Sequence, residues 1–445
     1  MRNRIDIDIW VPLYPFMPYF LDRTRELADQ FTSAHPEYRI QVTGVDWLSL
    51  PQAVHDAARR DAAPTIAQYF YTSTQEALDA RKPNGEPLFT PVERAIAGRT
   101  EILGEPVVLD DITPAARRYY TFDGEVAAMP PLTSTTLLYA NTSLLARAGI
   151  DDVPRTWAEL EAACRAVVAL PDGPEYGVNW PNHGWLFQQA AAQQGALLAD
   201  HDNGRSGRAG TMRLDSDAML AYFRWWRRLH RDGLYLYRGR PTSALSDWDA
   251  NFRAFADQRV AFTLTTSVEA ERMIGAGRDG GFTVRACRMP YNEQVPYAGN
   301  VIGGDALWLA DGLDQAALDG ALAFMQYLNA PRVAADRHRD TGFIAVTDGA
   351  IRLLDEEGWF KENPHFRTAL DQLAANDGSP AAQGGVLGDF AGIQRVLTEA
   401  MHDVLVSDVD ARDRLGLANA QAQRLLDDYN AACRGLRARG PITVG

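Results

Sequence analysis

The sequence predicts an α/β protein built as two lobes, and three features lead to this prediction. The chain has 445 residues, more than one ordinary domain holds. Its composition, 46% apolar and 23% charged, is that of an ordinary folded globular chain. Residues 5–42 alternate a strand pattern, a helix pattern and a second strand pattern, which is typical of a parallel α/β sheet.

A strand is predicted over residues 5–9, where isoleucines alternate with aspartates. Residues 10–18 carry three prolines, so we expect a loop there, with its aromatic side chains at the carboxyl end of the strand. A helix with one apolar face follows over residues 20–34, and a second strand over 38–42. Open α/β sheets bind ligands outside the carboxyl ends of their strands. The ligand cleft is therefore expected to contain Trp10, Tyr14 and Trp47.

The stretch 127–160 is predicted to carry the chain from one lobe to the other. A third buried strand over 64–71 and a hairpin-turn signal at Asp123-Gly124 precede it. Prolines within residues 129–131 fix the backbone and remove donors, so the next segment is a poor continuation of the same sheet. The hydroxyl-rich residues that follow are expected at the mouth of the cleft, and they include Ser134 and Thr135.

The second half of the chain continues with helices and strands. Thr156 followed by Glu159 fits a capping box, which predicts that a helix begins there. Gly303-Gly304 opens a late strand and would let the backbone approach a ligand, although a simple bulge is the plainer interpretation. The other predicted elements are a helix over 216–232, a helix headed by Trp248, and strands over 260–264, 282–289 and 301–309.

The charge and motif content argue against several classes of function. A formal net charge of −14 disfavours a nucleic-acid backbone or an anionic membrane as the main partner, but a small anionic ligand stays open. The eight histidines form no metal-binding spacing, and no nucleophile-elbow or phosphate-loop motif occurs. We therefore expect no catalytic residues, no metal and no cofactor.

The cysteines and the N-terminus bear on the compartment. Cys164 lies in a helical pattern and Cys287 in a strand pattern, which predicts buried free thiols; a disulfide involving these or Cys433 stays open. No run of 18 apolar residues occurs, so no transmembrane helix is predicted. Residues 1–10 lead straight into a strand, so either the protein is cytosolic or a signal or lipoprotein leader has been removed.

Seven segments, taken in order and spacing, resemble the extracytoplasmic solute-binding proteins of ABC importers, in the large carbohydrate-binding family that includes maltose-binding protein. They are residues 5–10, 20–34, 123–130, 138–150, 154–160, 255–262 and 302–308. The resemblance implies a periplasmic-binding-protein-like fold, in which two α/β lobes are joined by a multi-segment hinge with the ligand cleft between them. One strand motif departs from the family, because Asp257 and Gln258 replace its usual residue and glycine.

The C-terminal half is similar to the glycerol-3-phosphate-binding subgroup of that family, through residues 341–343, 357–364 and 387–395. The subgroup has an acidic residue where Tyr71 stands and an arginine at or beside Gln394. A phosphate needs a guanidinium or helix N-terminal amides, so the resemblance implies the location of the site but not its ligand. The ligand contacts that the subgroup implies are Trp47, Tyr71, Ser134, Trp185, Ser267, Gly304, Phe343 (a tyrosine in the subgroup) and Gln394.

Sugar recognition needs flat apolar faces and side-chain hydrogen bonds, and the chain offers both. We expect Trp157, Trp225, Trp226 and Trp308 in the core instead, because they fall on core patterns. Asn182 and Asp305 are further polar groups at cleft positions. The predicted ligand-binding residues are Trp10, Tyr14, Trp47, Tyr71, Ser134, Thr135, Trp180, Trp185, Trp248, Ser267, Gly303, Gly304, Phe343, Gln394 and Arg395.

The predicted function is high-affinity binding of a carbohydrate or polyol and its delivery to an ABC-type permease by hinge closure. A receptor for glycerol-3-phosphate or a glycerophosphodiester is the alternative within the family. A glycan-active or phosphodiester-cleaving enzyme and a cytosolic sensor are the alternatives outside it. The resemblance implies a monomer in the periplasm or lipid-anchored at the cell surface, working with ABC permease subunits.

The two lobes are each predicted to be built from two separate stretches of chain. Lobe I would hold residues 1–131 and 291–342, and lobe II would hold residues 132–290 and 343–445. The hinge is expected at residues 130–133, 288–291 and 342–346.

Overall fold

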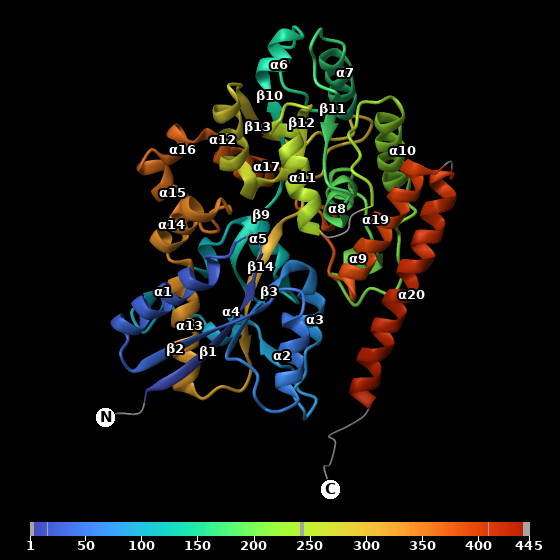
Figure 1. Cartoon of the computed structure of the whole chain (residues 1–445). Coiled ribbons are helices and arrows are strands. Elements are labelled where there is room, and N and C mark those ends of the chain that lie inside the picture. The colour runs from blue at the N-terminus through green and yellow to red at the C-terminus, as the bar shows by residue number, and fades with distance from the viewer. Residues whose placement is uncertain (1–3, 16, 241–243, 408, 439–445) are drawn as a thin grey trace.

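The computed structural model describes residues 4–15, 17–240, 244–407 and 409–438. Its first lobe is built on one mixed sheet, of strand order β2-β1-β3-β14-β4, with β9 also paired to β14 (Figure 1). Strands β1, β2 and β3 are parallel, as expected for the opening of the chain, whereas β14 runs antiparallel to its neighbours. The bounds are β1 Ile5–Leu13, β2 Tyr38–Asp46, β3 Ile66–Phe70, β4 Phe89–Thr90, β9 Met129–Ser134 and β14 Gly303–Ala310.

Helices cover both faces of the lobe I sheet. Helices α1 and α13 pack together on one side through the rings of Phe31 and Phe324, whose centroids are 5.2 Å apart. Helices α2 and α3 lie on the other side (Figure 1). The bounds are α1 Phe20–Ala34, α2 Leu50–Ala58, α3 Thr74–Asp79, α4 Val92–Ile96, α5 Pro114–Tyr119 and α13 Gln315–Asn329.

Two short hairpins complete lobe I: β5 (Glu101–Ile102) with β6 (Glu105–Pro106), and β7 (Thr121–Phe122) with β8 (Glu125–Val126). The turn of the second hairpin is Asp123-Gly124, and both residues have positive φ. Because that backbone conformation is what a tight two-residue hairpin requires, the turn predicted there is confirmed.

The predicted loop over residues 10–18 is wrong in its first part. Strand β1 continues through Pro12 to Leu13 in register with β2. Strand β3 pairs with β1 only at Ile9 and Trp10. Beyond Trp10, therefore, β1 has lost its neighbour on that side, and a proline is tolerated where no ladder hydrogen bond is needed.

The second lobe holds a four-stranded sheet of order β11-β12-β10-β13. The capping box predicted at Thr156 and Glu159 is confirmed, and it starts α7. Helix α10 agrees with the helix predicted over 216–232. The bounds are β10 Thr136–Asn141, β11 Tyr176–Asn179, β12 Val260–Thr266, β13 Val284–Arg288, α6 Thr142–Arg147, α7 Trp157–Val168, α8 Gly184–Gln193, α9 Asp200–Gly204, α10 Asp217–Arg231, α11 Ala244–Ala256 and α12 Ala270–Gly280.

A stack of three indoles fills the core of lobe II. Trp157 stacks on Trp225 at 4.8 Å and 9°, and Trp225 stacks on Trp180 at 5.4 Å and 12°. Trp226 and Tyr235 pack against Trp180 from the sides. The core roles expected for Trp157, Trp225 and Trp226 are therefore confirmed, and Trp180 belongs with them.

Three stretches of chain join the two sheets. The first passes directly from β9 to β10 through Thr135, the second links β13 to β14 over residues 289–302, and the third follows α14 over 342–347. The backbone N–H of Ile344 donates to the carbonyl of Thr133 at 2.8 Å, so the third stretch lies against the first.

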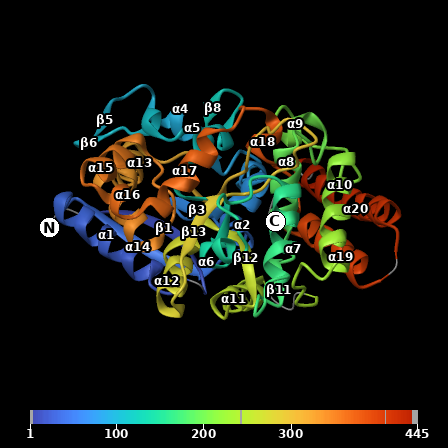
Figure 2. The same ribbon diagram turned by 90° about the horizontal axis from the view of Figure 1, so that it is seen from above.

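The C-terminal helices wrap around the joined lobes. Helices α10, α19 and α20 gather at the end of the molecule opposite α1 and α14 (Figure 2). Helix α20 packs along α19 and extends down beside α3 of lobe I (Figure 1). The bounds are α14 Pro331–Thr341, α15 Asp348–Glu356, α16 Trp359–Glu362, α17 Arg367–Ala374, α18 Pro380–Gln383, α19 Phe390–Val406 and α20 Ala411–Ala438.

Candidate functional site

One of the hydrogen-bonded contacts between the two lobes is centred on Tyr71. Tyr71 follows β3 of lobe I, and its hydroxyl oxygen accepts hydrogen bonds from Nε2 of Gln394 on α19 at 3.2 Å and Nε2 of Gln188 on α8 at 3.4 Å. Trp185, one helical turn before Gln188, packs against the start of β14. We call Tyr71, Trp185, Gln188 and Gln394 the interlobe seam.

The Tyr71 hydroxyl can still donate one hydrogen bond. A phenol oxygen that accepts two amide N–H groups still has its own proton to donate. Among the described residues, no acceptor for that proton is recorded, and Tyr71 is only 3% exposed. The seam therefore presents a buried donor to whatever occupies it.

A glycine sets the distance between α8 and α19. A Cβ built on Gly184 would lie 2.2 Å from Cβ of Gln394, so no larger residue fits without moving α19. His183 caps α8 by accepting from the backbone N–H of Trp185 at 3.2 Å. Burial lowers the pKa of His183 to about 4, so the cap is neutral at pH 7.

The wall of the seam beside the hinge holds unpartnered polar atoms. A Cβ on Gly303 would lie 3.0 Å from both Ser134 Oγ and Trp185 Cζ2, so these side chains surround that glycine. Trp185 Nε1 and Thr133 Oγ1 are buried and have no hydrogen-bond partner among the described residues. Buried polar atoms are nearly always paired, so these two atoms near Gly303 and Gly304 are ones that a polar ligand could satisfy.

Thr135 and Ser267 tie the first crossing to β12. The backbone N–H of Ser267 donates to the carbonyl of Thr135 at 2.7 Å, and that of Thr135 donates to Ser267 Oγ at 3.2 Å. The Thr135 hydroxyl is itself occupied, because it donates to the carbonyl of Val301 and accepts from Gln372 Nε2. Thr135 therefore holds the crossing together through both its backbone and its side chain.

Phe343 belongs to the third crossing. It is buried, and its carbonyl is bound by Nδ1 of His338 at 2.7 Å. The preceding Gly342 has a φ of +75° and would place a Cβ 2.6 Å from the carbonyl oxygen of Val268. Only glycine allows this close approach, which brings Phe343 next to the loop that carries Ser267.

Aromatic side chains of lobe I lead up to the seam. The rings of Tyr14, Trp47 and Phe70 meet with centroids 5.6 to 6.5 Å apart, and Phe70 lies 4.8 Å from Tyr71. Trp47 and Phe70 are half-buried and Tyr14 is buried. Trp248 stands on the lobe II side, where its ring lies 5.7 Å from that of His183.

Three predicted ligand contacts lie outside this group. Trp10 lies within β1 and not in a loop after it, because the strand continues to Leu13, and its Nε1 donates a hydrogen bond to Asp8 Oδ2. Trp180 is part of the indole stack of lobe II. Arg395 is exposed, since it lies about 100° around α19 from the buried Gln394.

Gln188 was not among the predicted site residues, and the hydrogen bonds that join Asp305 to Tyr14 and Gln68 in lobe I were not predicted either. Asp305 is 1% exposed and accepts from the Tyr14 hydroxyl at 2.6 and 2.5 Å and from Gln68 Nε2 at 2.8 Å. Burial raises the pKa of Asp305 to about 6. Gln188 lies three residues after Trp185, and this helical spacing is the signal that could have found it.

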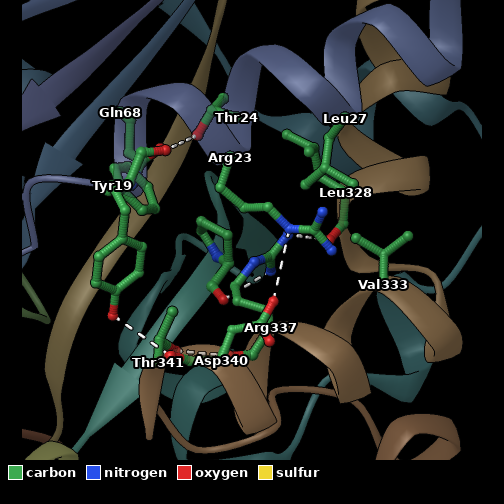
Figure 3. Close-up of a pocket in the computed structure, with 12 residues that line it drawn as sticks. Tyr19, Arg23, Thr24, Leu27, Gln68, Leu328, Val333, Arg337, Asp340 and Thr341 are labelled. Carbon is green, nitrogen blue, oxygen red and sulfur yellow. Dashed lines mark hydrogen bonds and ion pairs between the residues drawn. The ribbon is translucent and has the colours of Figure 1, made fainter.

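A separate cavity of about 30 Å³ lies behind the lobe I sheet, between α1 and α14 (Figure 3). It has room for about one water molecule, so it is too small for a sugar ring. Arg337 beside it donates to the carbonyls of Pro131 at 2.9 Å and of Leu328 at 2.5 Å, which pins α14 to the hinge strand β9. Gln68 lines this cavity and also reaches Asp305.

Metal and membrane features are absent from the described part of the chain. Its His, Cys, Asp and Glu residues form no cluster of three or more that could hold a metal ion. Within the same residues, no helix has the length and apolar character needed to cross a membrane. Cys164 and Cys287 are free and buried, as predicted, and Cys433 is also free.

Sequence comparison with known proteins identifies a family and its relatives. Residues 26–368 match the family of bacterial extracellular solute-binding proteins. The sn-glycerol-3-phosphate-binding periplasmic protein UgpB of Yersinia pseudotuberculosis serotype I (strain IP32953) is 26% identical over 386 residues, covering 85% of this chain and 83% of that protein.

Solved structures share the fold over nearly the whole chain. The cyclic α-maltosyl-1,6-maltose binding protein of Arthrobacter globiformis has a TM-score of 0.74 at 18% identity, covering 96% of this chain and 100% of that one. UgpB of Mycobacterium tuberculosis in complex with glycerophosphocholine has a TM-score of 0.72 at 20% identity, covering 96% and 99%. The predicted periplasmic-binding-protein-like fold is thus confirmed, and the family match extends across both lobes: the chain belongs to the bacterial extracellular solute-binding proteins.

Proposed function

We propose that this protein binds a neutral carbohydrate or polyol between its lobes and delivers it to an ABC-type permease by hinge closure. The observation that supports this most directly is the interlobe seam. Tyr71, Gln188 and Gln394 are uncharged hydrogen-bonding groups, and Trp185 adds a flat ring with an unpartnered N–H. Such groups suit the hydroxyls and the C–H face of a sugar.

The alternative solutes are glycerol-3-phosphate and glycerophosphodiesters, and two of the relatives favour them by name. A phosphate dianion is normally held by guanidinium forks or helix N-terminal amides. Arg395 is exposed, and the buried Arg205 uses three of its five N–H donors, one on each guanidinium nitrogen, to bind the carbonyls of Gly384, Tyr119 and Gln383. The charge of the seam therefore favours the neutral solute.

The proposal includes the division into lobes and the way they move. Lobe I is residues 1–131 with 291–342, and lobe II is residues 132–290 with 343–445, with bending at the three crossings. A solute that contacts both lobes would shift the equilibrium toward the closed form. The family works outside the cytoplasm, and we place this chain in the periplasm or on a lipid anchor, acting as a receptor and not as an enzyme.

A thermal-shift panel tests the ligand class. Maltose, maltotriose and glycerol form the neutral arm; glycerol-3-phosphate and glycerophosphocholine form the phosphate arm. A solute at ~100 times its Kd stabilises the folded state by about 2.7 kcal/mol, which gives a clear rise in Tm. A rise with the neutral arm supports the proposal, whereas a rise confined to the phosphate arm contradicts it and selects the alternative.

A further inference from the structure

The carboxylate of Asp305 is a buried negative charge that lacks a cationic partner. Its recorded partners are the Tyr14 hydroxyl and the Gln68 amide, both neutral, and no ion pair to it occurs among the described residues. An ionised carboxylate removed from water normally requires an opposite charge or a full set of donors. Asp305 therefore has electrostatic and hydrogen-bonding capacity that this chain leaves unused.

Tyr120 connects Asp305 to the interlobe seam. Its hydroxyl is buried and has no hydrogen-bond partner among the described residues. Burial, followed by the nearby Tyr119, Asp305 and Tyr71, raises the pKa of Tyr120 well above its usual value, and the buried guanidinium of Arg205 acts in the opposite direction. This unsatisfied hydroxyl therefore lies near both Asp305 and Tyr71, where a polar group of a solute could pair with it.

The aromatic rings form the second connection. Tyr14, which binds both oxygens of Asp305, also packs against Trp47 and Phe70, and Phe70 contacts Tyr71. A carboxylate backed by electron-rich ring faces attracts hydroxyl and ammonium donors and repels anions. Asp305 is also paired across the sheet with Phe70, next to Tyr71, so its network lies at the lobe I end of the seam and adds one negative charge there.

We propose that Asp305 is a specificity-determining residue of the solute site, where its charge admits solutes that present hydroxyl or ammonium donors and rejects those that present phosphate or sulfate. This inference rests on the proposed function and narrows its substrate class. If an anionic group of the solute lies about 10 Å from the Asp305 carboxylate, at an effective dielectric constant of about 20, the repulsion weakens binding of that solute roughly tenfold.

The test compares probes of one skeleton: glucosamine, glucose and glucose 6-sulfate, titrated calorimetrically into the full chain at pH 7.5. The wild type is expected to bind glucose and glucosamine at least tenfold more tightly than glucose 6-sulfate. Asp305→Asn keeps the shape and an acceptor for Tyr14 but removes the charge, and it should bring the sulfate ester to within about threefold of glucose. Asp311→Asn is the matched control, because it removes a carboxylate that pairs with Lys82 at the far end of β14.

A second measurement needs no variant and covers the case in which Asp305→Asn fails to fold. The sulfate ester keeps its charge at pH 5, whereas Asp305 becomes largely protonated. The titratable groups near Asp305 are Tyr14 and Tyr120, whose pKa values are raised by burial and which stay neutral in this range. Arg205 beside Tyr120 has its pKa lowered by burial to about 10, so it stays charged at both pH values. The rejection of glucose 6-sulfate should therefore weaken several-fold from pH 7.5 to pH 5.

The outcomes separate this inference from the proposed function. Unchanged rejection in Asp305→Asn or at pH 5, with glucose still bound, overturns the role of Asp305 and leaves the proposed function standing. Binding of the sulfate ester by the wild type as tightly as glucose also overturns it. Failure of the wild type to bind any neutral sugar or polyol contradicts the proposed function itself and the inference with it.

Discussion

The Tyr71 hydroxyl accepts a hydrogen bond from Nε2 of Gln394 at 3.2 Å, and this contact joins the sheet of lobe I to helix α19 of lobe II. The glycerol-3-phosphate-binding subgroup is expected to carry an acidic residue and an arginine at these two places. Here a neutral pair occupies both, and the two side chains still face each other. This contact across the lobes is therefore uncharged.

Replacing Gln394 by alanine should weaken solute binding. The change removes one seam hydrogen bond, worth about 0.5–1.5 kcal/mol, so the Kd of the best neutral solute should rise about threefold to tenfold. Calorimetric titration measures the change. Gln52→Ala, on the exposed face of α2, is the matched control and should bind like the wild type; equal affinity of the two variants would remove Gln394 from the site.

Gly184→Ala should disturb the seam through α19. The new methyl group would overlap Cβ of Gln394, so α8 and α19 must separate. Overpacking of this kind costs about 1–3 kcal/mol, and solute affinity should fall with it. Gly416→Ala in α20 meets no atom within 4 Å and should stabilise the protein by about 0.5–1 kcal/mol. Chemical denaturation of both variants checks the contrast, and two equal shifts would contradict it.

The free energy of unfolding should depend on pH through Asp305. Its pKa is raised from 3.8 to about 6 by burial, so the folded state binds the proton more tightly than the unfolded state does. Stability from this group is then full below pH 4 and lost as the pH rises through about 6. Relative to Asp305→Asn, the wild type should lose about 2 kcal/mol between pH 4.5 and 7.5.

Denaturant unfolding at the two pH values measures this loss. Only the difference between the proteins counts, because other groups titrate equally in both. A difference that stays constant with pH would show that Asp305 is not perturbed by burial.

Asp79 forms a clasp between lobe I and the C-terminal helix. It ends α3 and binds Arg208, the Tyr429 hydroxyl at 3.1 Å and the Cys433 thiol at 3.7 Å. Asp79→Ala should shift the lobes toward an open arrangement, because each charge-assisted hydrogen bond is worth about 1.5–3 kcal/mol.

The expected result is a larger radius of gyration without solute and a several-fold weaker affinity, although Asp79 is no part of the seam. Small-angle scattering and calorimetry measure the two effects. Asp428→Ala, at an exposed position of α20 beside Tyr429, is the control. An unchanged radius of gyration in Asp79→Ala would mean that the clasp does not restrain the lobes.

Much of the fold was predictable from local signals. The capping box at Thr156, the hairpin turn at Asp123 and the alternating isoleucines of β1 are each set by neighbours in sequence, and the structure contains all three. Pro12 led to the wrong prediction of a loop at residues 10–13. Whether a strand tolerates a proline depends on which strand lies alongside it, and the neighbour β3 is more than fifty residues away in the sequence.

The site was predictable in part. Tyr71, Trp185 and Gln394 come together around the seam, and resemblance to a known family pointed to all three. Residue type alone could not separate Trp180 from Trp185, since one joins an indole stack and the other meets Gly303. The network of Asp305 with Tyr14 and Gln68 joins residues more than two hundred positions apart. Local sequence patterns cannot predict such a contact.

The stacked indoles of Trp157, Trp225 and Trp180 also give the protein a built-in optical label. Rings held nearly parallel about 5 Å apart couple their electronic transitions and should produce a strong near-ultraviolet circular dichroism band. Loss of that band would report on the packing of lobe II. The part of the fluorescence that comes from Trp47, half-buried at the other lobe, is obtained by comparison with Trp47→Phe, so two optical signals can distinguish a variant that cannot bind from one that cannot fold.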